Sequence, residues 1–151
     1  MIDPVERFRA VAEDYCAIVD SPAELHLGNI SKSLAELYLA VRDLPDIWAT
    51  DDEFDPEIPT AQELALIDSL VTELGERDVY WSVDPYECEQ PIAASRGADL
   101  GEIWVDLKRG LIALEKGRRD AAIYLWGWGF QNHWGQHLTD ALRVIHGLRP
   151  A

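Results

Sequence analysis

RRDAAIYLWGWGFQNHWGQHLTDALRVIHGL, residues 118–148, is the stretch that decides the fold. Apolar side chains recur in it every three or four residues, which is the period of an amphipathic helix. At about 100° per residue, two histidines fall near the centre of the same stripe. We therefore predict one long helix that buries both histidines on its apolar face. The members of the stripe are Trp126, Phe130, His133, His137, Ala141 and Val144.

The segment before it, ADLGEIWVDLKRGLIALEKG (residues 98–117), has the same period and predicts another helix. Because the connection between the two helices is short, we expect them to lie side by side and antiparallel. The apolar stripe that would face the long helix consists of Leu100, Ile103, Leu107, Leu111 and Leu114.

Three more helices are predicted toward the N-terminus, at residues 4–20, 29–44 and 60–77. Thr60 and Glu63 have the spacing of a capping box that opens the third of these. The acidic stretch between the second and the third, residues 45–59, is predicted to be a linker or surface loop. The predicted fold class is therefore all-α, a single domain over residues 1–151 built as a bundle of about five helices.

One long segment, VYWSVDPYECEQPIAASRG (residues 79–97), contains two prolines and no sustained period. It predicts an irregular loop, and long loops in compact domains are often packed or functional. Its aromatic side chains Tyr80, Trp81 and Tyr86 favour a loop that packs against the bundle.

Composition limits the classes of partner. The formal net charge is −15, with 28 acidic and 13 basic side chains, so binding to nucleic acid or to anionic lipid is not expected. A basic protein partner fits this charge. The longest nearly apolar run, residues 121–130, is too short to span a bilayer, and no signal peptide begins the chain, so we expect a cytoplasmic protein. Cys16 and Cys88 lie too far apart for a zinc ribbon or a disulfide scaffold.

Acidic residues of the segment 98–117 offer partners for the two histidines. In an antiparallel pair, equal rise per residue places Asp99 level with His137 and Glu102 level with His133. Asp106 falls nearer to Phe130. By angle, Asp99 and Asp106 border the apolar stripe, whereas Glu102 points toward solvent. The predicted polar site therefore consists of Asp99, Glu102, Asp106, His133 and His137.

Three interpretations of this polar site stay open. The acids and histidines satisfy each other as a structural clamp, or Asp99, His133 and His137 bind a divalent transition metal such as zinc, iron or manganese. The third is acid–base catalysis by a histidine that an aspartate orients. The metal patterns HExxH and Glu-x-x-His are absent, because Trp134 follows the first histidine and no glutamate precedes a histidine by three residues.

Four stretches resemble a family of bacterial proteins, the domain of unknown function numbered five thousand and sixty-three. Its most specific element is HWGxH followed by DALRxxH. The resemblance implies a helical bacterial domain with a shared polar site that includes Trp104 and His146, and it supplies no activity. Ala98 and Glu102 replace aspartates of the family pattern, which lowers the acidic count. The stretches are SLAELYLAVRDLP (33–45), VDPY (83–86), ADLGEIWVDLKRGL (98–111) and FQNHWGQHLTDALRVIHGL (130–148).

For function, we expect a non-enzymatic binding or accessory protein whose polar site lies between its last two helices. One alternative is a metal-binding protein or metal-dependent enzyme that uses Asp99, His133 and His137. The other is an immunity-type inhibitor that binds a basic partner through its acidic surface.

Overall fold

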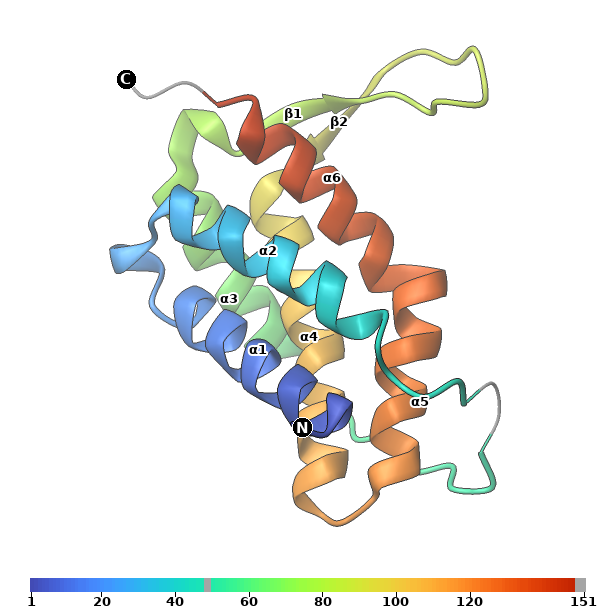
Figure 1. Cartoon of the computed structure of the whole chain (residues 1–151). Coiled ribbons are helices and arrows are strands. Elements are labelled where there is room, and N and C mark those ends of the chain that lie inside the picture. Colours follow the sequence, from blue (N-terminus) through green and yellow to red (C-terminus); the bar gives the residue numbers. More distant parts are fainter. Residues whose placement is uncertain (48–49, 149–151) are drawn as a thin grey trace.

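The computed structural model describes residues 1–47 and 50–148, and helices make up most of it (Figure 1). Short 3₁₀ turns lie at Pro22–Glu24 and Gly75–Arg77. The mainly helical fold is thus confirmed. The helices are α1 (Pro4–Val19), α2 (Leu27–Val41), α3 (Thr60–Leu74), α4 (Arg96–Glu115), α5 (Arg119–Gly129) and α6 (Gly135–His146).

The helix that we predict over residues 118–148 is present, but a π turn interrupts its regular geometry. Phe130–Trp134 forms this turn between α5 and α6, and the three parts follow one another as a single rod, coloured orange to red in Figure 1. A π turn contains one more residue than an α-turn, so it rotates every residue after it about the helix axis.

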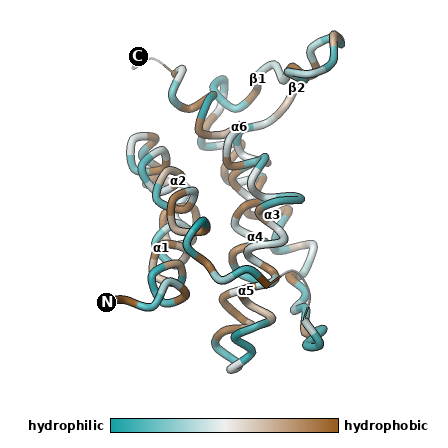
Figure 2. Tube along the Cα trace, turned by 45° about the vertical axis from the view of Figure 1, so that its right-hand side comes forward, coloured by the Kyte–Doolittle hydropathy of each residue, from teal (hydrophilic) through white to brown (hydrophobic). Residues whose placement is uncertain are grey.

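Helix α4 lies at the centre of the bundle and packs against α1, α3, α5 and α6. In Figure 2, apolar and polar positions alternate in short steps along the helices, as expected where each helix buries one face. Trp126 and Trp134 are the largest fully buried side chains, and the ring of Phe8 from α1 lies 4.7 Å from the ring of Trp126. The aromatic core therefore joins the rod to α1.

The all-α prediction is wrong in one detail, because residues 79–97 contain a small antiparallel sheet. Strands β1 (Val79–Ser82) and β2 (Ile92–Ser95) pair with Trp81 opposite Ala93. Trp81 and Tyr86 are 69% and 93% exposed, so the predicted packing of this segment against the bundle is also wrong for them. Side chains alternate along a strand, and here Tyr80 faces the bundle while Trp81 faces away. Figure 1 shows the hairpin extending beyond the helices.

The predicted capping box at the start of α3 is wrong as well. Pro59 occupies the N-cap position of α3, no side chain caps the helix, and Thr60 is its first helical residue. A capping box needs the Ser or Thr at the N-cap itself. The carboxylate of Glu63 therefore has another environment, which is described below.

The acidic segment between α2 and α3 forms the predicted surface loop within its described residues, and positions 48–49 lie outside them. It is tied to the bundle by ion pairs of Asp52 with Arg118 and of Asp55 with Arg109. Phe54 is partly buried against the core. Within residues 1–47 and 50–148, the helices are too short or too polar to cross a membrane.

Candidate metal centre

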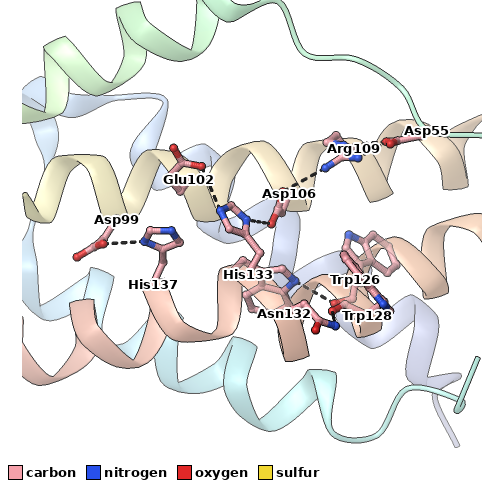
Figure 3. A network of polar contacts seen from close by, with 11 residues as sticks. Asp55, Asp99, Glu102, Asp106, Arg109, Trp126, Trp128, Asn132, His133 and His137 are labelled. Atoms are coloured by element: carbon pink, nitrogen blue, oxygen red, sulfur yellow. Dashed lines mark hydrogen bonds and ion pairs between the residues drawn. The ribbon is translucent and has the colours of Figure 1, made fainter. Parts of the chain in front are cut away.

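Two aspartates of α4 hold the two histidines of the rod (Figure 3). Nδ1 of His137 lies 2.8 Å from Oδ1 of Asp99, and Nδ1 of His133 lies 2.6 Å from Oδ2 of Asp106. Both aspartate side chains are only 8% exposed. A carboxylate accepts hydrogen bonds and cannot donate them when ionised, so each imidazole carries its proton on Nδ1.

The predicted pairing of Asp99 with His137 is what the structure contains, whereas Asp106 lies elsewhere than predicted. We expected Asp106 near Phe130, and it contacts His133 instead. Glu102 and Asp106 are four residues apart on one face of α4. The imidazole of His133 extends between them and reaches both, since its Nε2 lies 3.5 Å from Oε2 of Glu102.

The histidines are less buried than predicted. The side chains of His133 and His137 are 44% and 29% exposed, while Trp134 and Leu138 occupy the centre of the buried face. The π turn explains the difference, because its extra residue rotates the apolar stripe by one position relative to an ideal α-helix. The histidines consequently border the core and face solvent on one side.

Side chains stabilise the π turn at its irregular carbonyl groups. Nε1 of Trp134 donates to the carbonyl oxygen of Trp126 at 2.9 Å, and Nδ2 of Asn132 donates to that of Trp128 at 2.9 Å. A Cβ atom on Gly135 would lie 2.2 Å from the carbonyl oxygen of Phe130. The turn therefore requires glycine at position 135, and it carries His133 into the site.

A set of three donors points to one place on this surface. Donor atoms of Glu102, His133 and His137 all lie within 4.8 Å of one another. Because the aspartates engage Nδ1 of each ring, Nε2 is the nitrogen with a free lone pair. In Figure 3, the Glu102 carboxylate extends from α4 toward Nε2 of His133.

The ligand set therefore differs from the predicted one, in which Asp99 accompanies the histidines. Both oxygens of Asp99 are engaged, one with His137 and the other with the hydroxyl of Tyr80, which donates to it at 2.5 Å. Glu102, which we placed toward solvent, faces the histidines. Tyr80 was missed as a site residue because the sequence shows no strand alternation that would turn it toward α4.

Arg109 and the loop residue Asp55 close one side of the site. Nη1 of Arg109 lies 3.4 Å from Oδ1 of Asp106, and the same guanidinium pairs with Asp55. Beside His133 lies a cavity of about 360 Å³ that gives this face room for water or a small ligand. Its lining includes Asp55, Asp106, Arg109, Tyr124, Trp128 and His133.

Three titratable groups in and around the site have shifted pKa values. The hydrogen bond with Asp99 raises the pKa of His137, and burial opposes this shift. Burial raises the pKa of Glu63 on α3, and the adjacent carboxylate of Glu102 raises it further. Burial and then Asp99 raise the pKa of Asp140 on α6. Two acids that sequence analysis left out, Glu63 and Asp140, thus lie close to the predicted five residues.

A family model described as domain of unknown function (DUF5063) matches residues 2–150. The chain belongs to this family. The resemblance found in the four sequence stretches is thereby confirmed, and the family's function is unknown, as the resemblance implied. No curated protein matches the chain.

The fold has a counterpart among solved structures. The crystal structure of protein BF1032 from Bacteroides fragilis superposes with a TM-score of 0.82 at 23% sequence identity, over 99% of this chain and 94% of the other. At this identity the similarity extends to the fold alone.

The chemistry available to the DUF5063 site follows from its donors. Two imidazole nitrogens and a carboxylate form the type of ligand set that binds zinc, iron or manganese. Aspartates on the far side of each ring fix its orientation, as outer partners of metal-bound histidines do.

Proposed function

We propose that this protein binds one divalent transition-metal ion through Nε2 of His133, Nε2 of His137 and the carboxylate of Glu102. The observation that carries the proposal is the pair of buried aspartates behind the histidines. Each holds Nδ1 and leaves Nε2 directed toward the glutamate. Imidazoles that bind metals nearly always donate their other N–H to such a partner.

A purely structural clamp explains the site less well. Burying a carboxylate costs free energy, which its hydrogen bonds and ion pairs must recover. Here the aspartates are buried, while the side chains of His133 and His137 are 44% and 29% exposed. A half-exposed imidazole can hydrogen-bond with water and needs no buried acid, so the aspartates are better explained as groups that orient a ligand.

The donor set favours a first-row transition ion over magnesium or calcium, which prefer oxygen ligands alone. Three protein donors on an exposed face leave a coordination position for water, which is typical of catalytic rather than structural zinc sites. The cavity beside His133 opens on the side of Asp106 and Arg109. We therefore infer a metal-binding protein whose ion is accessible to a small ligand.

The test is the metal content of untagged protein purified without chelator, followed by titration with Zn²⁺. We expect one equivalent of metal in the wild type and its loss in the double variant His133→Ala/His137→Ala. His146→Ala, which removes an exposed histidine of α6, is the matched control and should retain the metal. A wild type that neither carries metal nor binds added Zn²⁺ contradicts the proposal.

A further inference from the structure

We propose that the β1–β2 hairpin is a docking site for a basic segment of a partner protein, which binds in extended form and packs on Trp81. The surface concerned is the outer face of the hairpin, formed by Val79, Trp81 and Ala93, since side chains of paired residues lie on the same face. This docking site is independent of the metal site, because it lies opposite to Tyr80, whose hydroxyl contacts Asp99.

The hairpin carries nearly half of the large apolar side chains that are exposed in the described part of the chain. Their exposed fractions lie between 49% and 93%. Every residue from 83 to 93 is exposed, and Figure 1 shows the hairpin extending beyond the helices. Apolar side chains that gather on one exposed surface mark an interaction site, whereas single ones do not. The exposed apolar side chains of the hairpin are Val79, Trp81, Val83, Tyr86 and Ile92.

The base of the hairpin is held firmly, so its outer face has a fixed position. The carboxylate of Asp78, just before β1, accepts hydrogen bonds from the hydroxyl of Ser95 at 2.9 Å and from the backbone N–H of Gly97 at 2.8 Å. On the inner face, the hydroxyl of Tyr80 donates to Asp99 at 2.5 Å. A surface that is fixed before binding loses less conformational freedom when a partner binds.

The two strands lack most of the features that prevent an exposed edge from pairing. Their sequences, VYWS and IAAS, contain no charged residue and no proline. Within the described residues the sheet has two strands, so each strand has an edge that no other strand covers. A third strand stabilises such a hairpin, and addition of an extended segment to a sheet edge is a common mode of recognition. Because each strand has only four residues, few backbone bonds can form and Trp81 must supply much of the affinity.

The charge of the hairpin favours a basic partner and opposes a second copy of this chain. Asp84, Glu87 and Glu89 are exposed at its tip, and no lysine or arginine occurs between residues 78 and 95. Lysine or arginine side chains of a partner can pair with these carboxylates and lie over the ring of Trp81. Two copies, each with a net charge of −15, repel each other.

The first experiment measures binding of a fluorescently labelled peptide of alternating lysine and valine by anisotropy, with chelator present. A peptide of alternating glutamate and valine with the same length is the control, and it should not bind. We expect Trp81→Ala to lower the affinity for the lysine peptide at least about 10-fold, because tryptophans dominate the affinity of many interfaces. Trp128→Ala, which removes an exposed tryptophan of α5, is the matched variant and should bind as the wild type does.

The second experiment tests the charge without altering the apolar face. Glu87→Gln/Glu89→Gln should lower the affinity roughly 2- to 30-fold, the effect of two exposed ion pairs, and should make binding less sensitive to sodium chloride. Glu53→Gln/Glu57→Gln changes the net charge equally in another exposed acidic loop, and it should retain the affinity of the wild type. Equal thermal unfolding of all variants confirms that each is folded, as expected for exposed positions.

Several outcomes would overturn the docking site. If the lysine peptide does not bind the wild type, or binds no better than the glutamate peptide, the hairpin does not select a basic segment. If Trp81→Ala binds as tightly as Trp128→Ala, the peptide is attracted by net charge alone. Sedimentation of the wild type without peptide tests the remaining occupant. A dimer that Trp81→Ala abolishes would assign the outer face to a second copy of the chain.

Discussion

Asp106 contributes to the site without contacting the proposed ion, and this makes it a sharp test at the scale of single residues. Its carboxylate holds Nδ1 of His133 at 2.6 Å. Asp106→Asn keeps the shape and removes the charge, so the imidazole of His133 is less firmly oriented. We expect Zn²⁺ affinity to fall about 10- to 100-fold. Asp68→Asn, on the exposed face of α3, serves as the control and should leave the affinity unchanged. Equal affinity in Asp106→Asn would mean that the aspartate only packs.

Tyr15 provides a prediction of pH dependence away from the site. Its hydroxyl donates to the carbonyl oxygen of Leu100 at 2.7 Å in the core, and burial raises its pKa well above the ordinary value of 10.0. The unfolded chain loses this proton near the ordinary pKa, whereas the folded chain keeps it. The stability that Tyr15 contributes is therefore complete below about pH 10 and is lost as the pH rises toward the folded pKa.

Urea unfolding at several pH values tests this. At neutral pH, Tyr15→Phe should be less stable than the wild type by about 1 kcal/mol, the typical net value of one hydrogen bond. Between about pH 9 and pH 11 it should lose less stability than the wild type, since one titrating group is gone. Tyr86→Phe, which alters an exposed tyrosine, should follow the wild type. An alkaline loss as large in Tyr15→Phe as in the wild type would contradict the prediction.

At the residue scale, sequence reasoning reached the five central side chains but assigned some of them wrong positions. Helical rise and angle along the two antiparallel helices predicted that Asp99 pairs with His137, and the structure contains this pair. The same reasoning wrongly directed Glu102 toward solvent. It assumed that each side chain points straight out from the helix, whereas a glutamate has three rotatable bonds and can bend toward a neighbour. Glu63 was overlooked for a different reason. The local pattern of a capping box accounted for it, and contacts between distant helices cannot be derived from local spacing.

The π turn is the element that brings His133 to the site, and Gly135 tests its importance. A methyl group at position 135 would overlap the carbonyl oxygen of Phe130, so Gly135→Ala must shift the backbone. We expect a loss of roughly 1–3 kcal/mol in the free energy of unfolding, together with weaker Zn²⁺ binding. Gly127→Ala is the matched control. It lies in α5 with no atom within 4 Å of an added Cβ, and it should gain about 0.5–1 kcal/mol through helix propensity. If both variants behave alike, the turn is not constrained as proposed.

At the element scale, helix positions could be predicted and helix irregularity could not. Apolar repeats are strong in α1 to α4 and in the rod, so the helices were found within a few residues of their ends. One extra residue in a turn shifts the apolar repeat by one position, but the glycines around the turn interrupt the repeat and hide this shift in the sequence. The hairpin escaped prediction because each strand is four residues long and its outward face carries Val79 and Trp81, which resemble packed residues.

The whole molecule carries far more negative than positive charge, and this must affect its stability. A net charge of −15 on a chain of 151 residues favours expansion through repulsion among carboxylates. The surface ion pairs, such as Arg119 with Asp3 and Arg7 with Asp43, are exposed and contribute little each. Salt screens both the repulsion and the ion pairs where the charges lie more than roughly 8–10 Å apart at physiological ionic strength. The repulsion among carboxylates acts over longer distances than the contacts within each ion pair. Screening should therefore weaken the repulsion more than it weakens the ion pairs.

We therefore expect sodium chloride to stabilise the metal-free protein at neutral pH, in contrast to a protein held together by surface ion pairs. The measurement is the midpoint of urea unfolding at low and at high sodium chloride concentration, with chelator present so that the metal site does not contribute. Near the isoelectric point of about 4.4, repulsion is small and the gain from salt should disappear. A decrease of stability with salt at neutral pH would show that the ion pairs outweigh the repulsion.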